Sequence, residues 1–310
     1  MNFLELREKY PEFSYNWYKI EENENEYKIT YEFEIKGLSK FNPTWTIPKM
    51  DKSKNNIPNK ELLENMVFNL GMVELVSYWK ITCAPHVTVK NIYLSQKQID
   101  WWKKLYFYGL GEFFYKNNIK TNIDEFMNIT AGTNKLLKSE INISDEFTGA
   151  LVPIGGGKDS IVTLNVIKDD FANNMCYVIN PRGATEETAE TAGYGENKRC
   201  YVKRTLDKNM LELNKQGYLN GHTPFSSIVA FSALIVAYLN KKKYIVLSNE
   251  ASANESTIYE EEVNHQYSKS YEFEQDFNEY VKENILDGIE YFSLLLSLIH
   301  ISEPTRRSYI

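Results

Sequence analysis

Three consecutive glycines followed by a lysine, an aspartate and a serine form the part of this sequence that is best suited to chemistry. The run consists of Gly155, Gly156, Gly157, Lys158, Asp159 and Ser160. Residues without a Cβ allow consecutive backbone N–H groups to turn inward and approach a phosphate closely. Ser160 adds a hydroxyl donor and Lys158 a mobile positive charge. Residues 155–160, called the glycine loop below, therefore predict a phosphate-binding site.

The residues on either side of the glycine loop predict a strand before it and a helix after it. Residues 148–154 form a short, mostly apolar run. After the loop, apolar residues recur at helical spacing, at Ile161, Val162, Leu164, Val166 and Ile167. A helix that begins within the loop turns its positive N-terminal end toward a bound phosphate.

Two common phosphate-loop patterns do not fit the glycine loop. The GxxxxGK[ST] pattern fails because Val152 stands at its first glycine and Asp159 follows the lysine. The dinucleotide pattern GxGxxG fails because Ser160 stands at its last glycine.

The glycine loop resembles instead the S-G-G-x-D-S loop of the PP-loop ATP pyrophosphatase superfamily, with Gly155 in place of the first serine. This departure removes one hydroxyl, so backbone amides must supply part of the phosphate contact. The resemblance implies a doubly wound parallel sheet and an enzyme that splits ATP to AMP and pyrophosphate. It also implies that residues 155–160 hold the ATP phosphates and that Asp159 orients the loop or contacts Mg²⁺.

Three further segments narrow the resemblance to one family. They are residues 220–226 (NGHTPFS), 248–253 (SNEASA) and 263–270 (VNHQYSKS). Together with the glycine loop, they resemble the UDP-N-acetyl-α-D-muramoyl-L-alanyl-L-glutamate epimerases over about residues 1–292. The resemblance implies that UDP-MurNAc-L-Ala-L-Glu is the substrate. It implies an ATP- and Mg²⁺-dependent inversion of the terminal glutamate, in peptidoglycan precursor synthesis.

The same segments supply the other candidate site residues. Asn249 and Glu250 follow a strand end and are candidates for substrate or metal contact. His222, His265 and Lys269 are candidates for proton transfer, or for gripping the carboxylates and diphosphate of the substrate. Each has a structural alternative: His222 as the cap of the helix beginning near Pro224, His265 as a polar core residue, Lys269 as a solvated charge.

Three charged residues are expected in a loop after the second strand of the same block and are interpreted as mostly solvated. They are Arg182, Glu186 and Glu187.

Composition and charge limit the class of protein. The chain has 310 residues, with 35 Lys and Arg against 42 Asp and Glu, a net charge of −7. An acidic chain without a basic stripe argues against nucleic acid or an anionic membrane as partner. The three cysteines are far apart and form no C-x-x-C pair, so no disulfide framework or thiolate zinc site is expected. With no signal-like or membrane-spanning stretch, a cytoplasmic location is expected.

Hydrophobic periodicity divides the chain into two blocks. Residues 27–35 alternate as a half-buried strand does, and residues 62–73 have helical spacing. Ser95 and Gln98 fit a capping box that opens a helix running through Phe113. We therefore expect a mixed α+β domain at residues 1–145, and the ATP-binding domain at residues 146–295.

The second domain should contain parallel strands near residues 148–154, 175–179, 199–203 and 244–247, and an apolar helix at 227–239.

Residues 296–310 are expected to be a non-native tail. The end of the chain, SLLLSLIHISEPTRRSYI, changes character abruptly and resembles a translated sequencing adapter. A genuine apolar strand at residues 294–299, with a turn at Pro304, is the alternative. If the tail is non-native, the ATP-binding domain is truncated at its C-terminus.

Two other functions stay open at this point. One is another AMP-forming PP-loop enzyme, such as an amidating synthetase or an RNA-thiolating enzyme, although the latter would want a basic face or catalytic cysteines. The other is a nucleotide-binding fragment without turnover. The sequence leaves the oligomeric state open.

Overall fold

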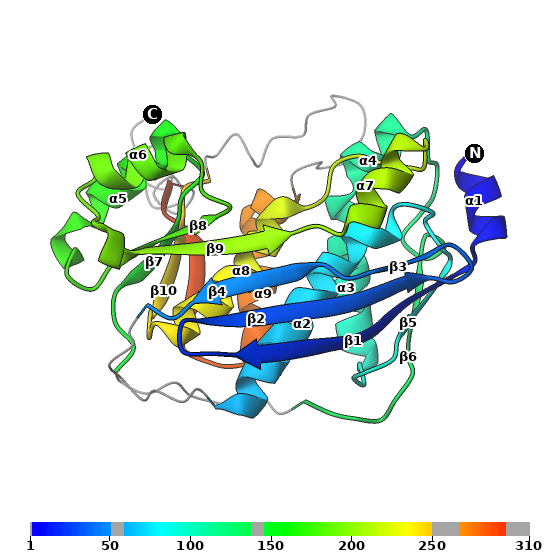
Figure 1. Ribbon diagram of the computed structural model, residues 1–310, viewed down its shortest axis with the longest axis horizontal. Helices are drawn as coiled ribbons and strands as arrows, with labels where there is room; N and C mark the ends of the chain where they lie inside the picture. The colour runs from blue at the N-terminus through cyan, green and yellow to red at the C-terminus, as the bar shows by residue number, and fades with distance from the viewer. Residues whose placement is uncertain (1, 51–58, 138–145, 250–266, 296–310) are drawn as a thin grey trace, which may run out of the picture.

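One mixed sheet organises the described part of the molecule (Figure 1). The computed structural model describes residues 2–50, 59–137, 146–249 and 267–295. In these ranges the sheet has eleven strands, in the order β11-β10-β7-β8-β9-β4-β2-β1-β5-β6, with β3 beside β2. The strands are β1 Glu12–Glu22, β2 Glu26–Ile35, β3 Ser39–Phe41, β4 Thr44–Pro48, β5 His86–Val89, β6 Asn128–Ala131, β7 Ala150–Pro153, β8 Met175–Ile179, β9 Arg199–Thr205, β10 Tyr244–Leu247 and β11 Glu290–Ser293.

Helices cover the sheet and fill the connections. They are α1 Phe3–Lys9, α2 Lys60–Trp79, α3 Gln96–Gly109, α4 Gly111–Lys116, α5 Lys158–Val166, α6 Gly183–Thr191, α7 Lys208–Lys215, α8 Phe225–Leu239 and α9 Tyr271–Asn284, with short 3-10 turns η1 Lys168–Asp170, η2 Glu196–Lys198 and η4 Tyr267–Lys269. No helix in the described ranges is both long and apolar enough to span a bilayer.

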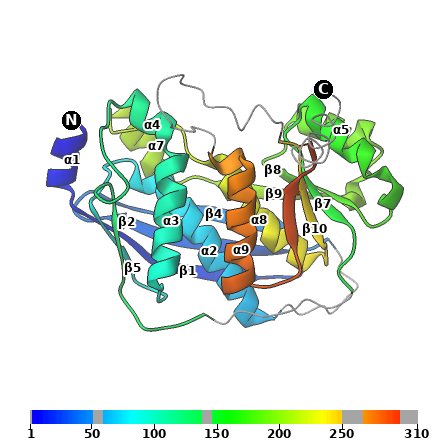
Figure 2. The same ribbon diagram turned by 180° about the vertical axis from the view of Figure 1, so that it is seen from behind.

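In the first half of the sheet, β1 to β4 form an antiparallel meander packed on α2, and β5 and β6 continue it as parallel strands beside β1. Alternate residues of β2 are buried, as expected for a strand with one face toward the core. Asn59 starts α2, because its side chain accepts the N–H groups of Glu61 and Leu62. Behind the sheet, α2 lies between the β1–β2 hairpin and α8, with α3 and α9 outside it (Figure 2). This position explains why α2 is buried on nearly every side.

The second half of the sheet is the parallel part that the sequence predicted. Strands β9, β8, β7, β10 and β11 pair side by side and all run parallel. In chain order this is 3-2-1-4-5, the order of doubly wound folds. Val152 and Val178 face one core, shared with α5 and α6, while Leu151 and Tyr177 face the larger core, shared with α8. Helices therefore cover both faces.

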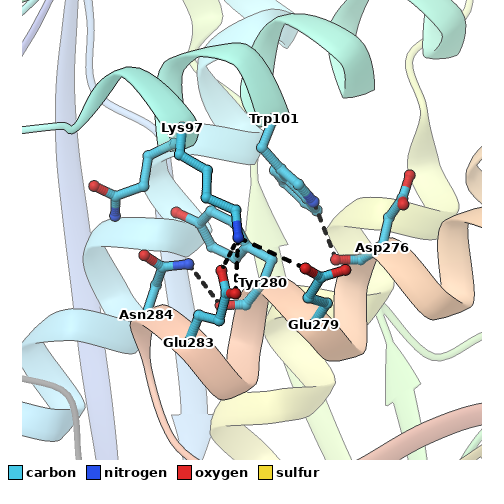
Figure 3. A pocket seen from close by; sticks show the side chains of 8 residues that line it. Lys97, Trp101, Asp276, Glu279, Tyr280, Glu283 and Asn284 are labelled. Carbon is cyan, nitrogen blue, oxygen red and sulfur yellow. Dashed lines mark hydrogen bonds and ion pairs between the residues drawn. The ribbon is translucent and has the colours of Figure 1, made fainter.

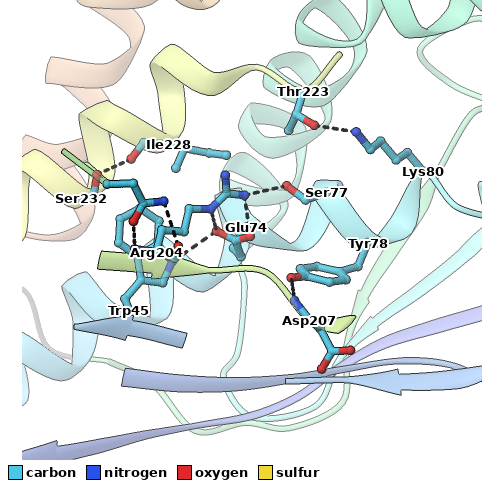
Figure 4. A network of polar contacts seen from close by, with 11 residues as sticks. Trp45, Glu74, Ser77, Tyr78, Lys80, Arg204, Asp207, Thr223, Ile228 and Ser232 are labelled. Atoms are coloured by element: carbon cyan, nitrogen blue, oxygen red, sulfur yellow. Dashed lines mark hydrogen bonds and ion pairs between the residues drawn. The ribbon is translucent and has the colours of Figure 1, made fainter. Parts of the chain in front are cut away.

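β9 joins the two halves, because it pairs with β8 on one side and antiparallel with β4 on the other. The buried pair of Arg204 on β9 and Glu74 on α2 reinforces this junction (Figure 4). The parallel sheet is thus one part of a larger mixed sheet. The division into domains at 1–145 and 146–295 stays a prediction.

One predicted helix is wrong in its extent. The Ser95–Gln98 capping box is confirmed, but the helix it opens ends at Gly109, and α4 follows as a separate helix. A Cβ at position 109 would lie only 2.7 Å from the Cβ of Pro224, so glycine there lets the segment before α8 pack closely. Glu250, His265 and the predicted tail at 296–310 lie outside the described residues.

Candidate nucleotide-binding site

The glycine loop connects the carboxyl end of β7 to the start of α5. Ile154 still pairs with β8, since its N–H donates to the carbonyl of Tyr177 at 2.8 Å. Gly157 is the N-cap of α5, with φ −98° and ψ 169°, and no side chain caps this helix. The N–H of Gly155 lies 3.4 Å from the Ser160 hydroxyl, which closes the loop on itself. The strand, loop and helix predicted from sequence are therefore present.

The three glycines meet different surroundings. Gly156 has φ +82°, where L side chains are strained, and a Cβ there would lie 3.2–3.3 Å from Ala184 and Thr185. Gly155 and Gly157 are exposed, and a Cβ at either would meet no atom within 4 Å. The fold itself therefore requires glycine only at position 156, and the space in front of the other two is open to a ligand.

The side chains of the loop differ in exposure in a way that suits phosphate binding. Lys158 is exposed, Asp159 is half-buried and Ser160 is only 5% exposed. Among the described residues, no group of three His, Cys, Asp or Glu side chains could hold a metal ion by itself. Mg²⁺ is commonly held by one or two carboxylates together with substrate phosphates, so Asp159 stays the candidate metal ligand that the sequence predicted.

Other polar groups lie at the same edge of the sheet, where the parallel strands end. Asn249, a sequence candidate, and Ser248 follow β10, the neighbour of β7. The Ser248 Oγ and Asn249 Nδ2 atoms are buried and have no hydrogen-bond partner in the described structure. A buried polar atom left without a partner is costly, so a bound ligand is one way to satisfy it.

Arg182, which the sequence analysis treated as solvated, is also at this edge. It is exposed, as predicted, but it is the N-cap residue of α6, whose next residues lie against Gly156. Their position in the sequence could have identified Ser248 and Arg182, because they follow β10 and β8, the two strands that flank β7. The predicted loop is wrong for Glu186 and Glu187, which lie on α6, where Glu186 is half-buried and Glu187 is exposed.

His222 and Lys269 form a second group of candidates, away from the glycine loop. The Nδ1 atom of His222 lies 3.7 Å from Glu112 on α4, and α4 and α5 are at opposite ends of the long axis (Figures 1 and 2). Burial is the main cause that lowers the pKa of His222, Glu112 opposes it, and positive charges, including that of Lys269, lower it further. His222 does not cap α8, whose N-cap is Pro224.

A buried lysine that the sequence analysis missed supports the His222 segment. Lys80 is 6% exposed and follows the last turn of α2. Its amine donates to the carbonyl of Gly221 and, at 2.8 Å, to the hydroxyl of Thr223 (Figure 4). Burial is the largest cause that lowers the pKa of Lys80 to about 8. The available signal was a lysine directly after the long apolar stretch that ends α2.

A groove lies between α3 and α9 (Figure 3). Its volume is about 120 Å³, below the roughly 300–1,000 Å³ of most small-molecule sites. Trp101 stacks on Tyr280 with ring centroids 4.2 Å apart, and Lys97 bridges Glu279 and Glu283 over them. These side chains satisfy one another, so the groove is a packed helix interface with a charged rim.

The cysteines provide no reactive thiolate in this fold. Cys83, Cys176 and Cys200 are all buried and unpaired. Burial raises the pKa of Cys176 and of Cys200 to about 12, and also raises that of Cys83. Because the thiolate is the nucleophile, this disfavours the RNA-thiolating alternative.

Sequence comparison identifies relatives of the chain. The family model described as "MurL N-terminal domain" matches residues 5–294. Three similar proteins carry the name UDP-N-acetyl-alpha-D-muramoyl-L-alanyl-L-glutamate epimerase. The one from Xanthomonas oryzae pv. oryzae is 29% identical over 235 residues, covering 75% of this chain and 51% of the relative.

The relative from Salinispora tropica is 28% identical over 275 residues, covering 87% of this chain and 58% of the relative. The one from a Micromonospora species is 31% identical over 237 residues, covering 75% and 52%. The chain thus spans about half the length of the curated relatives it matches. No solved structure matches it.

Proposed function

The chain belongs to the MurL N-terminal domain family, and on that premise we propose that it is the ATP-activating part of a UDP-MurNAc-L-Ala-L-Glu epimerase. In this proposal the terminal L-glutamate is inverted to D-glutamate while ATP is converted to AMP and pyrophosphate. The names of the relatives supply the substrate, and the glycine loop supplies the reason to expect ATP.

The position of the glycine loop in the sheet is the main support for this proposal. β7 is central in the parallel half, with β8 on one side and β10 on the other, and the connections leave toward opposite directions at this point. Ligands of doubly wound sheets bind at the carboxyl ends of strands at such a switch point. The open space before Gly155 and Gly157 and the unpartnered Ser248 and Asn249 atoms are at that edge. The residues present fit a PP-loop ATP site.

The chemistry of epimerisation explains why ATP is needed. Removing the α-proton next to an ionised carboxylate would put two negative charges on adjacent atoms. When the carboxylate attacks the α-phosphate of ATP, pyrophosphate leaves and an acyl adenylate forms. Its carbonyl can take up the charge of the deprotonated carbon as an enolate. A base removes the proton, an acid returns one to the other face, and water then releases AMP.

The candidate residues, of which His265 and Glu250 lie outside the described ranges, divide this work between them. The backbone amides of residues 155–157 and the Ser160 hydroxyl hold the phosphates, with Lys158 as a mobile counter-charge. Asp159 would be the protein ligand of a Mg²⁺ ion, which would supply positive charge beside the phosphates. His222, His265, Lys269 and Glu250 stay the candidates for proton transfer or substrate contact.

Nucleotide binding without turnover is a second candidate function for this chain alone. It is favoured by the length comparison, because the chain covers only 51–58% of its relatives. It is also favoured by the separation of His222 from the glycine loop. Under this alternative the chain binds ATP and releases no AMP.

Deuterium incorporation tests the main proposal. UDP-MurNAc-L-Ala-L-Glu, ATP and Mg²⁺ are incubated in heavy water with this chain and, in parallel, with a chain extended to the length of its relatives. The proposal expects deuterium at the glutamate α-carbon, because the abstracted proton exchanges with water on a side chain. AMP should appear in step with the D-isomer.

The reaction products separate the alternatives. An amidating synthetase would release AMP, leave the α-hydrogen in place and join an amine to the carboxylate. AMP without deuterium in the extended chain would reject the epimerase, and ADP with phosphate would reject the PP-loop assignment as well.

A further inference from the structure

One arginine lies beside the glycine loop with a side chain that the fold does not use. The described ranges contain four arginines, at positions 7, 182, 199 and 204. The guanidinium groups of Arg7, Arg199 and Arg204 bond to backbone carbonyls or to carboxylates. The guanidinium of Arg182 is exposed and forms no hydrogen bond or ion pair with any described residue. Its donors are therefore available to a ligand.

We propose that Arg182 binds the β- and γ-phosphates of ATP and the pyrophosphate that they become. This inference rests on the proposed function and adds a residue to it, at a position where the sequence indicated only a solvated charge. A guanidinium presents N–H donors in a planar fork that can bond to two phosphate oxygens at once. It also keeps its proton throughout the pH range in which proteins are folded.

The start of α6 places Arg182 against the glycine loop. A Cβ added to Gly156 would lie 3.2 Å from the carbonyl carbon of Ala184 and 3.3 Å from the Cγ2 atom of Thr185. These residues are the second and third after Arg182, and consecutive Cα atoms are only about 3.8 Å apart. The α5 and α6 helices also pack against each other at this end of the sheet (Figure 1). Arg182 is therefore adjacent to the predicted phosphate-binding loop.

The backbone on both sides of Arg182 is fixed. Asn180 has φ +50°, a left-handed conformation that residues other than glycine seldom adopt. Its side chain bonds to both the N–H and the carbonyl of Arg204 on β9, at 2.9 Å each. After the turn, the N–H of Arg182 donates to the Thr185 hydroxyl at 3.0 Å. Binding would thus cost the freedom of the Arg182 side chain alone and not that of a loop.

Two positive side chains lie on either side of the same loop. Lys158 is the first residue of α5, Arg182 precedes α6, and both are exposed. Within the described residues, neither Glu186 nor Glu187 forms an ion pair with Arg182, although both lie on α6. Two unpaired cations beside open backbone amides favour a ligand with several negative charges, as a polyphosphate has.

The movement of charge in the first chemical step gives Arg182 a role beyond binding. A carboxylate oxygen of the substrate bonds to the α-phosphorus, and the bond from this phosphorus to the oxygen bridging to the β-phosphate breaks. That oxygen leaves with the electron pair, so negative charge builds up on the pyrophosphate. A guanidinium bonded there stabilises this charge in the transition state and transfers no proton. Arg182 should therefore affect the rate of AMP formation as well as the binding of ATP.

Titration of this chain with inorganic pyrophosphate, ATP and AMP tests the contact. Arg182→Ala should weaken the binding of pyrophosphate and of ATP at least tenfold, the loss of about one charged hydrogen bond. AMP binding should not change, because AMP lacks the β- and γ-phosphates. Arg182→Lys should restore only part of the affinity, since it keeps the charge and loses the fork.

Lys168→Ala is the matched control for these titrations. Lys168 is exposed and lies just beyond the other end of α5, so the variant removes one positive charge from the same part of the protein. It should leave all three affinities unchanged. The thermal midpoint of Arg182→Ala should also stay unchanged, because the side chain has no partner in the described fold.

Kinetics of the extended chain test the role in the transition state. Arg182→Ala should lower kcat for AMP formation at least tenfold, because the interaction grows stronger as pyrophosphate leaves. A variant that raises only KM would show that Arg182 binds ATP and its transition state equally, which contradicts this role.

The outcomes separate this inference from the proposal on which it rests. ATP binding that is weakened by Gly157→Ala but unchanged in Arg182→Ala overturns the inference and leaves the glycine loop as the ATP site. Equal weakening of AMP and ATP binding in Arg182→Ala also overturns it, since the contact is then not with the pyrophosphate end. Pyrophosphate binding through Arg182, without deuterium at the glutamate α-carbon in the extended chain, supports the inference and removes the epimerase reaction.

Discussion

Glycines 155 and 157 differ from Gly156 in what a side chain would meet, and this difference makes the loop testable residue by residue. At position 156 the backbone has φ +82° and the neighbouring α6 is close. At 155 and 157 a methyl group would point into open space. A substitution at 155 or 157 therefore changes the ligand's side of the loop and leaves the packing of the protein alone.

Alanine substitutions should separate binding from folding. Gly157→Ala is expected to weaken ATP binding by tenfold or more, about 1.4 kcal/mol, with no change in the thermal midpoint. Gly156→Ala is expected to destabilise the fold by roughly 1–2 kcal/mol, because an L residue is strained at positive φ. Binding is measured by calorimetry and stability by circular dichroism. Unaltered ATP binding in both Gly155→Ala and Gly157→Ala would contradict the loop assignment.

Asp159→Asn tests the charge in the same loop. It keeps the shape of the side chain and removes the carboxylate that should face Mg²⁺. We expect AMP formation by the extended chain to fall by at least a hundredfold, an estimate for losing a metal contact to the phosphates. ATP binding without Mg²⁺ should change little. AMP release at the original rate would show that Asp159 has no such role.

Lys80 gives the molecule a measurable pH dependence. The folded pKa of about 8 lies below the unfolded value of 10.5, so between these pH values the unfolded chain binds more protons. Stability from this group is complete above pH 10.5 and is lost as pH falls to about 8. Its size is at most on the order of 3 kcal/mol.

Urea unfolding of Lys80→Met isolates that contribution. Relative to the unaltered chain, the variant should gain less stability between pH 8 and pH 10, because methionine does not titrate. The tyrosines titrate in both chains and cancel in the difference. An identical pH dependence in the two chains would mean that Lys80 is not held in a buried, proton-poor state.

For single residues, the sequence predicted features that depend on adjacent residues and missed those that depend on tertiary packing. The glycine loop was readable because glycine, lysine, aspartate and serine are adjacent in the chain. Lys80 was missed because its partners, Gly221 and Thr223, lie about 140 residues away. Only packing of α2 against the segment before α8 reveals why this lysine is buried.

Among the secondary-structure elements, β9 and α2 are joined by a buried ion pair that links the two halves. Arg204 makes a bidentate pair with Glu74, at 2.7 and 3.0 Å, and Glu74 also accepts the Trp45 indole N–H (Figure 4). The Glu74 side chain is fully buried. Removing one partner would leave the other charge in the core without compensation.

A double-mutant cycle should measure this link. Arg204→Met is expected to cost about 3–5 kcal/mol of unfolding free energy, as breaking a buried pair does. Adding Glu74→Leu should restore part of the loss, because no uncompensated charge then remains. The exposed Lys19–Glu21 pair is the control, where substitution should cost less than about 1 kcal/mol. Additive effects at Arg204 and Glu74 would show that they do not interact.

The presence of the helices and strands was predicted better than the residues where helices end and the partners with which strands pair. β2, β8 and β10 match the predicted residues closely, since each strand shows its own pattern of apolar residues. The break between α3 and α4 was missed because Pro224, which packs on Gly109, is remote in sequence. The pairing of β4 with β9 was missed for the same reason.

For the whole molecule, the shared sheet and core predict a single unfolding transition. All five tryptophans lie in the first block, at residues 17, 45, 79, 101 and 102, whereas Cys176 and Cys200 are buried in the second. We expect tryptophan fluorescence and cysteine accessibility to change at the same urea concentration, because β9 ties both blocks into one sheet. Two separate midpoints would instead support independent domains at 1–145 and 146–295.

The pairing of β4 with β9 also matters while the chain is being synthesised. β4 ends at residue 48 and its partner β9 at residue 205, so a ribosome adds about 157 residues between them (205 minus 48). At about 5–20 residues per second, synthesis takes on the order of ten to thirty seconds. During that time the nascent meander presents β4 as a bare edge, a template for pairing with other chains. Early translation is therefore when wrong pairing at this edge is most favoured.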